Sequence, residues 1–187
     1  DDELLEKFFS GEPLTREEIH RGLRIGVLNS ELIPVLVGCA TKNIGIHTML
    51  DMFIDYLPCP SDLKPYVVTD LNGEEVERKT DANEPFSAYV FKTIVDPYSG
   101  VINLIKINSG VLKAGDEVYV SNNSTQRVSN LYVMTGKNLQ AVDQLGAGDI
   151  AAINHMDNLQ SGMTLSDPKR PVVFKPVVYP TAVIHKA

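Results

Sequence analysis

The feature that most constrains this chain is a series of short apolar segments between residues 85 and 167, separated by turn residues at close intervals. The segments are rich in Val, Ile and Tyr, whereas Gly, Asp, Asn and Ser fill the breaks between them. This spacing is typical of antiparallel strands that form a barrel or a sandwich. We expect strands at 87–94, 100–107, 117–121, 126–134 and 150–153.

The first third of the chain has a different pattern. Apolar residues recur at helical spacing in 4–9 and in 46–57, which predicts a helix in each segment. Between them, Thr15 and Glu18 have the spacing of a capping box, so a further helix is expected to begin there. Ile33 to Val37 is nearly all apolar and resembles a strand buried on both faces of a parallel sheet. We therefore expect an incomplete α/β arrangement of helix, helix, strand and helix.

Charge and composition exclude several classes of protein. The 187 residues carry a net charge of −7, which argues against a general nucleic-acid-binding surface and makes any RNA contact local. We find no apolar run long enough to cross a bilayer and no signal-peptide pattern. The two cysteines, Cys39 and Cys59, cannot by themselves form a disulfide framework or a zinc site. We expect a cytoplasmic protein without a membrane segment.

Two segments have the composition of linkers. Residues 61–84 and 168–176 are rich in polar residues and proline, and we expect them to connect domains without a core of their own. The last residues, 177–184, are typical of a single strand, which needs a partner to be stable. We therefore expect part of a first domain at residues 1–60, a linker at 61–84 and a barrel at 85–167. Residues 168–187 are expected to hold a second linker and one strand.

Two groups of residues in the front suggest chemistry but have simpler interpretations. Cys39 follows a predicted strand and precedes a helix, where a thiolate is favoured, but no histidine is near it in sequence. An inert, buried cysteine is the better interpretation, and Cys59 is expected to be exposed. The side chains of His47, Asp51 and Asp55 share a helix face at a spacing that metal sites use. A solvated surface helix presents the same pattern, so we expect no metal site.

The β region contains polar residues with two possible roles. Asp116 and Asp149 follow glycines in predicted tight turns, where we expect them to cap the next backbone amides. Basic side chains make phosphate contacts with RNA, but they also keep the outer face of a barrel strand solvated. Both interpretations apply to the four candidates for RNA contact: Lys92, Lys106, Lys113 and Arg127.

Several motifs taken together resemble elongation factor G. The β region resembles domain II of that factor in motif order and spacing, at Phe86 to Lys92, Asp96-Pro97, Ser109 to Leu112, Gly115-Asp116, Ala147 to Ile150 and Gly162 to Leu165. In the front, Pro34 to Ala40 resembles the last guanine-binding motif of its GTP-binding domain, and Tyr56 to Pro60 resembles the exit from that domain. The tail from Tyr179 resembles the first strand of domain III.

The resemblance implies part of a GTP-dependent factor that drives translocation on the ribosome in protein biosynthesis. It implies that the guanine base of GTP contacts Gly38, Cys39, Ala40 and Thr41 in a longer protein, with GTP and Mg²⁺ as cofactors. Cys39 stands where the family usually has Ser, which weakens a hydroxyl contact and leaves a backbone contact intact. The β-barrel would couple the nucleotide state to docking on small-subunit ribosomal RNA.

The motifs that bind phosphate and discriminate guanine in a GTPase are not in this sequence. We find neither GxxxxGK[ST] nor NKxD. We therefore expect no catalytic residues and no bound cofactor in this chain, although the parent protein is expected to be a GTPase. Two alternatives remain open. One is a paralogue of elongation factor G that protects the ribosome or acts as an adapter. The other is a barrel that receives the aminoacyl end of transfer RNA, as in elongation factor Tu-like proteins.

Overall fold

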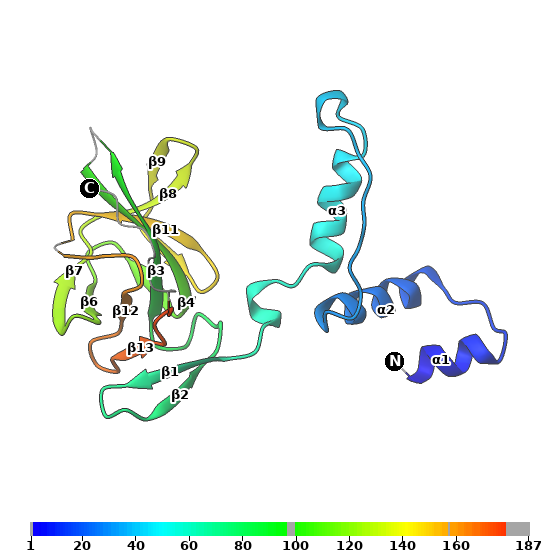
Figure 1. Ribbon diagram of the computed structural model, residues 1–187, viewed down its shortest axis with the longest axis horizontal. Helices are drawn as coiled ribbons and strands as arrows, with labels where there is room; N and C mark the ends of the chain where they lie inside the picture. The colour runs from blue at the N-terminus through cyan, green and yellow to red at the C-terminus, as the bar shows by residue number, and fades with distance from the viewer. Residues whose placement is uncertain (1, 97–99, 157, 179–187) are drawn as a thin grey trace, which may run out of the picture. The chain divides into compact units, whose positions relative to one another are not determined.

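The computed structural model describes residues 2–96, 100–156 and 158–178. The chain divides into two compact units, Asp1–Asp62 and Leu63–Ala187. The first contains three α-helices and the second contains antiparallel strands (Figure 1). The predicted mixed fold class is confirmed at this level. The second half of the Asp96-Pro97 turn and the tail from Tyr179 lie outside the described residues.

The first unit begins with two helices joined by side chains. Its helices are α1 Asp2–Phe9, α2 Arg16–Leu28 and α3 Ile46–Tyr56, with short 3-10 turns at Ala40–Lys42 and Pro60–Asp62. The capping box is confirmed, because the Glu18 amide donates to Thr15 Oγ1 at 3.3 Å and the Thr15 amide donates to Glu18 Oε2 at 2.7 Å. Lys7 Nζ also donates to Glu18 Oε1 at 2.7 Å, linking α1 to α2. The Lys7 ammonium and the Thr15 amide together lower the pKa of Glu18 to about 2.

Polar contacts also join α2 to α3 and to the turn that follows. The Tyr56 hydroxyl and His20 Nδ1 lie 2.8 Å apart, and their rings are stacked. Arg24 donates to the Asp55 carbonyl oxygen and to Asp62 Oδ2, each at 2.8 Å. These polar contacts link α2 to the segment that follows it, and Tyr56 is the one buried apolar side chain among the described residues of the unit.

The predicted strand at Ile33–Val37 is wrong for this structure. The segment has no strand pairing among the described residues, and the side chains of Ile33, Val35 and Val37 are 84%, 85% and 93% exposed. A strand needs a hydrogen-bonded neighbour, and the described part of this unit contains no other extended segment that pairs with it. The segment is therefore apolar in sequence but exposed in the structure.

The described residues of the second unit form three antiparallel sheets. Its strands are β1 Tyr66–Asp70, β2 Glu75–Arg78, β3 Ser87–Asp96, β4 Gly100–Ser109, β5 Val111–Lys113, β6 Glu117–Val120, β7 Ser124–Arg127, β8 Leu131–Thr135, β9 Asn138–Ala141, β10 Gln144–Gly146, β11 Ile150–Asn154, β12 Thr164–Ser166 and β13 Val172–Phe174. The largest sheet has the order β7-β6-β12-β3-β4-β11-β8-β9, β10 pairs with β5, and β13-β1-β2 form the third. The pairings among described strands leave the largest sheet open, since none joins β7 to β9.

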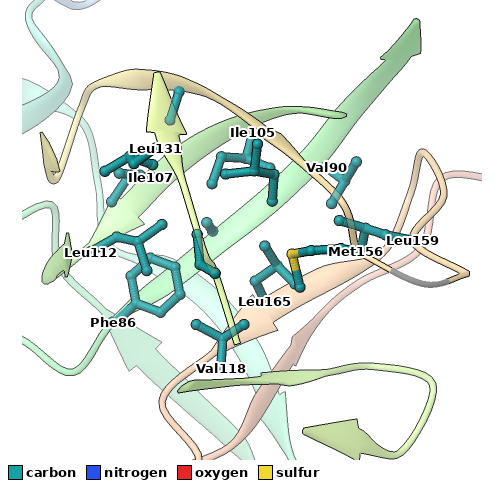
Figure 2. Close-up of a cluster of buried hydrophobic side chains, with 14 of the residues drawn as sticks. Phe86, Val90, Ile105, Ile107, Leu112, Val118, Leu131, Met156, Leu159 and Leu165 are labelled. Carbon is teal, nitrogen blue, oxygen red and sulfur yellow. The ribbon is translucent and has the colours of Figure 1, made fainter. Parts of the chain in front are cut away.

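One apolar core lies between the strands of this unit. Side chains from β3, β4, β11 and β12 converge there, as Figure 2 shows for Val90, Ile105 and Leu165. Ile105, Ile107 and Ile153 have no exposed surface. Alternating residues of a strand face opposite sides, so the alternation seen in the sequence places these side chains inside and their neighbours outside.

The segment predicted as one strand at 126–134 is two strands in the structure. β7 ends at Arg127, and β8 begins at Leu131. Between them Val128 is buried, and its backbone pairs with the turn before β6: its amide donates to the Asp116 carbonyl oxygen at 2.9 Å and its carbonyl oxygen accepts from the Gly115 amide at 2.7 Å. The chain then leaves β6 and pairs with β11. The break thus occurs where the chain changes partners.

Both segments predicted as linkers contribute strands to the third sheet. β1 and β2 form a hairpin within 61–84, and β13 adds to it with Val68 opposite Phe174 and Asp70 opposite Val172. Val68 and Val172 are each 1% exposed. These segments are about 100 residues apart in the chain, and their pairing depends on folding of the β region between them, which local composition does not reveal.

The two aspartates predicted to stabilise turns do so. Asp116 Oδ2 accepts from the Lys113 amide and Asp149 Oδ2 accepts from the Gly146 amide, both at 2.9 Å. Each capped amide lies three residues before the aspartate, and not after it as we had expected. Gly115 and Gly148, with φ of +94° and +100°, take the left-handed backbone that these turns require.

No described helix is both long and apolar enough to span a bilayer. Within the described ranges, we find no cluster of three His, Cys, Asp or Glu side chains able to hold a metal ion. His47, Asp51 and Asp55 lie along α3, and all three are exposed there, as expected of a solvated helix face.

Candidate functional site

The turn from Gly38 to Gly45 contains the predicted guanine-contacting residues. Cys39 and Ile44 pair across it, with the Cys39 amide donating to the Ile44 carbonyl oxygen at 2.9 Å and the Ile44 amide donating back at 3.0 Å. A Cβ at Gly38 would lie 2.9 Å from the Ile44 carbonyl oxygen, and one at Gly45 would lie 3.0 Å from that of Val37. Gly45 also has φ +74°. Glycine is therefore required at both ends, and the turn is compact.

Cys39 is half-buried and hydrogen-bonded, which differs from the fully buried cysteine that we expected. Its Sγ lies 3.3 Å from Thr41 Oγ1. This contact, with hydrogen bonds from the Lys42 and Thr41 amides, lowers the pKa of the Cys39 thiol. No described histidine or carboxylate hydrogen-bonds to Sγ, so the geometry favours a sulfur that accepts hydrogen bonds within the turn over a catalytic nucleophile. Cys59 is exposed, as predicted.

The other three residues of this group are exposed. Gly38, just before the 3-10 turn, and Ala40 and Thr41 within it are exposed to solvent. The Ala40 amide has no backbone acceptor among the described residues. The structure thus brings the four predicted residues into one turn with an available backbone donor.

Two of the predicted RNA-contacting residues lie on neighbouring strands. Lys106 of β4 is directly opposite Tyr89 of β3, and Lys92 of β3 is opposite Leu104 of β4. A β-bulge at Phe91 separates the two pairs. Lys106 is half-buried and Lys92 is exposed. Both lysines lie outside the apolar core, whose β4 members are Ile105 and Ile107.

The other two predicted residues meet at a turn. Lys113 is exposed at the end of β5, and Arg127 Nε donates to the Gly115 carbonyl oxygen at 3.0 Å. Arg127 therefore supports the turn between β5 and β6, a structural role that its sequence context did not indicate. The four basic residues form two pairs, one on β3 and β4 and one at this turn.

Sequence reasoning missed the aromatic residues beside Lys106. A pocket of about 370 Å³ includes Lys106 and the buried Asn108, whose Oδ1 has no hydrogen-bond partner among described residues. Its aromatic lining is Tyr66, Tyr89, Phe91 and Phe174. The aromatic residues of Tyr89-Val90-Phe91-Lys92 were visible in the sequence. The contribution of Phe174 required the β1–β13 pairing.

Comparison with known proteins shows which family has a similar sequence. The family profile for elongation factor G domain 2 matches residues 85–168. Elongation factor G of Ureaplasma parvum serovar 3 is 39% identical over 185 residues, covering 98% of this chain. That of Aquifex pyrophilus is 40% identical over 189 residues, covering 100% of this chain. The chain spans 27% of the length of each of these relatives.

A solved structure gives the same result for the fold. A crystal structure of a Thermus thermophilus protein superposes with a TM-score of 0.70 and 29% identity, covering 91% of this chain and 23% of that one. The family profile, the identity along nearly the whole chain and the shared fold agree with one another. The chain therefore belongs to the elongation factor G family and covers the domain 2 region of that factor.

Proposed function

We propose that this chain is part of a GTP-dependent translocation factor that acts on the ribosome in the cytoplasm. The observation that carries the proposal is the identity of 39–40% to elongation factor G along 98–100% of the chain. A paralogue that protects the ribosome or serves as an adapter would share this segment, so the proposal concerns the role of the longer protein.

In this proposal, residues 1–60 are the end of a GTP-binding domain and residues 85–167 are a closed β-barrel. Two observations support the division. The chain separates into units between Asp62 and Leu63, and the domain 2 profile begins at residue 85. Residues 61–84 connect the two, and residues 168–187 lead to a third domain. The strands β1, β2 and β13 then lie at the base of the barrel segment, where its two ends meet.

The turn at Gly38 to Thr41 is proposed to hold the guanine base in the longer protein. The available Ala40 amide is a donor suited to the carbonyl oxygen of guanine, and Gly38 lets the backbone close tightly against Ile44 so that the turn keeps this shape. Cys39 Sγ is already engaged by Thr41 and by backbone amides, so its role is to hold the turn. GTP and Mg²⁺ would need the phosphate-binding and metal-binding residues of the longer protein.

The barrel is proposed to dock on small-subunit ribosomal RNA. Lys92, Lys106 and Lys113 supply cations for phosphate contacts, and the aromatic pocket beside Lys106 offers stacking surfaces. Arg127 faces the same turn as Lys113 but is bound to the Gly115 carbonyl oxygen. Its Nε is used in stabilising the turn, and we propose that its exposed guanidinium also takes part in the RNA contact. In this proposal, the docked barrel couples the nucleotide state of the GTP-binding domain to the position of the factor on the ribosome.

Calorimetry on this chain tests the guanine proposal. With GTP and Mg²⁺ we expect no tight binding, because the phosphate-holding motifs are absent from the sequence. The longer protein should bind GTP, and Ala40→Pro, which removes the amide donor, should weaken its affinity while Lys64→Gln should not. Unchanged affinity in Ala40→Pro would remove this turn from the guanine site.

Ribosome association of the longer protein tests the docking proposal. Replacing Lys92, Lys106 and Lys113 by Glu should weaken association and reduce the salt dependence, by roughly one unit of slope for each phosphate that the protein no longer binds. Lys64→Glu is a matched exposed control. If the slope of the triple variant equals that of the parent protein, these lysines only solvate the strands.

A further inference from the structure

Arg78 is a buried cation without a counter-charge. It is the last residue of β2 and is only 8% exposed. Its Nε is buried without a hydrogen-bond partner among the described residues, and its one contact is from Nη1 to the Glu77 carbonyl oxygen at 3.5 Å, at the limit of a hydrogen bond. No described carboxylate forms an ion pair with it. A buried, unpaired guanidinium is costly, so the site lacks a partner that would offset that cost.

Arg78 lines a pocket that other cations surround. The pocket has a volume of about 500 Å³ and lies between the β1–β2 hairpin and the loop before β13. The loop contributes Lys169 and Arg170, both exposed, and the hairpin contributes Asp70 and its turn. Three cationic residues thus line one pocket, and Arg78 is the buried one of the three.

The loop that carries Lys169 and Arg170 is held at both ends. Ser166 Oγ donates to the Val172 carbonyl oxygen and accepts from the Val172 amide, both at 3.1 Å. Within the loop, the Lys169 amide donates to Asp167 Oδ1 at 2.9 Å and the Arg170 amide to the Asp167 carbonyl oxygen at 3.1 Å. The loop is therefore shaped before any ligand arrives, which reduces the entropy lost on binding.

The one carboxylate of the pocket lining is occupied by its own turn. Asp70 Oδ1 accepts from the Asn72 amide at 2.8 Å and from the Glu74 amide at 2.9 Å, and Oδ2 accepts from Asn72 Nδ2 at 3.2 Å. The Glu74 and Asn72 amides lower the pKa of Asp70, so it remains charged. Three cations and one carboxylate leave the pocket positive. This excess suits a small ligand with about one to two negative charges and several acceptor oxygens.

We propose that Arg78, Lys169 and Arg170 form a binding site for a phosphate group. The guanidinium of Arg78 lines the pocket and has no counter-charge among the described residues, while the exposed Lys169 and Arg170 add positive charge at the rim. The phosphate comes either from a free phosphorylated compound or from the backbone of RNA. The site is separate from the guanine turn and from the four basic residues discussed above, and it stands without the proposed function.

Phosphate binding is tested on the whole chain at neutral pH in a buffer without phosphate. We expect saturable binding of inorganic phosphate by calorimetry, with a shift of the Arg78 Nε–H signal in the ¹⁵N NMR spectrum. Arg78→Met should fold, since it removes a buried charge, and should weaken binding by about 30-fold or more. Lys169→Gln with Arg170→Gln changes only exposed residues and should weaken it by about threefold. Lys137→Gln, an exposed control on the β8–β9 hairpin, should bind as the parent chain does.

Two further ligands distinguish the source and the chemistry. A short single-stranded RNA that binds more tightly than phosphate, and loses that advantage in Arg78→Met, identifies RNA as the source. Tighter binding of inorganic phosphate identifies a free compound. The proposal is overturned if phosphate does not bind, if acetate binds equally well, or if Arg78→Met binds phosphate as the parent chain does. These experiments measure phosphate binding and not ribosome association, so a negative result does not contradict the proposed function.

Discussion

The two units of this chain bury their apolar residues to different extents. In the second unit, Ile105 and Ile153 have no exposed surface. In the described part of the first unit Tyr56 is the one apolar side chain with almost complete burial, while Phe9 and Val37 are 77% and 93% exposed. The first unit is instead organised by caps and ion pairs that link residues near in sequence or on adjoining helices. Local hydrogen bonds specify helices, whereas burial needs long-range pairing of strands.

Separating the units should give the largest effect. We expect residues 63–187 to unfold cooperatively when expressed alone, because the core and all three sheets lie within them. Residues 1–62 should show helical signal without a cooperative melt, since apolar burial is small. Circular dichroism during heating measures both. A sharp, cooperative transition in 1–62 would contradict the comparison.

Truncation of one apolar side chain in each unit sharpens the contrast. Ile105→Ala removes a side chain with no exposed surface and should reduce the free energy of unfolding by about 2–5 kcal/mol. Ile33→Ala removes one that is 84% exposed and should change it by less than about 0.5 kcal/mol. Urea unfolding curves measure both. Similar losses at the two positions would show that Ile33 is buried in solution.

The capping box is the next largest expected effect. Thr15→Ala removes the acceptor of the Glu18 amide at the start of α2 and should destabilise this helix by about 1 kcal/mol. Thr15→Ser keeps the hydroxyl and serves as the matched control. Hydrogen exchange of the first α2 amides reports the change. Exchange should be unaltered in the second unit, and equal exchange in both variants would exclude a capping role.

The smallest expected effect is the acid dependence of the first unit. The pKa of Glu18 is lowered from 4.5 to about 2, first by Lys7 and then by the Thr15 amide. Its stabilising contribution is therefore fully present above pH 4.5 and is lost as the pH falls toward 2. The pair is half-buried and still reached by solvent, which keeps the effect small. Helical signal followed from about pH 6 to about pH 2 should fall less in Glu18→Gln, and equal profiles would oppose this assignment.

Several features of the fold and the candidate site were predictable because they depend on neighbouring residues. The box formed by Thr15 and Glu18 and the glycine turns at Gly115 and Gly148 are short-range arrangements. The turn at Gly38 was predicted as a candidate site from its motif. Its hydrogen bonds, which hold Cys39 half-buried, depend on Ile44 and Thr41 and were not predicted.

The sequence by itself determined where helices begin, where most strands lie and to which family the chain belongs, since each is encoded in short patterns or in their order. Tertiary structure alone decided the break at Val128, the pairing of β1 with β13 and the burial of Arg78. Each depends on contacts outside its own segment, and β1 and β13 are about 100 residues apart, so local composition does not reveal them. The exposure of Ile33–Val37 has the same cause, because an apolar run is buried only when a neighbouring strand covers it.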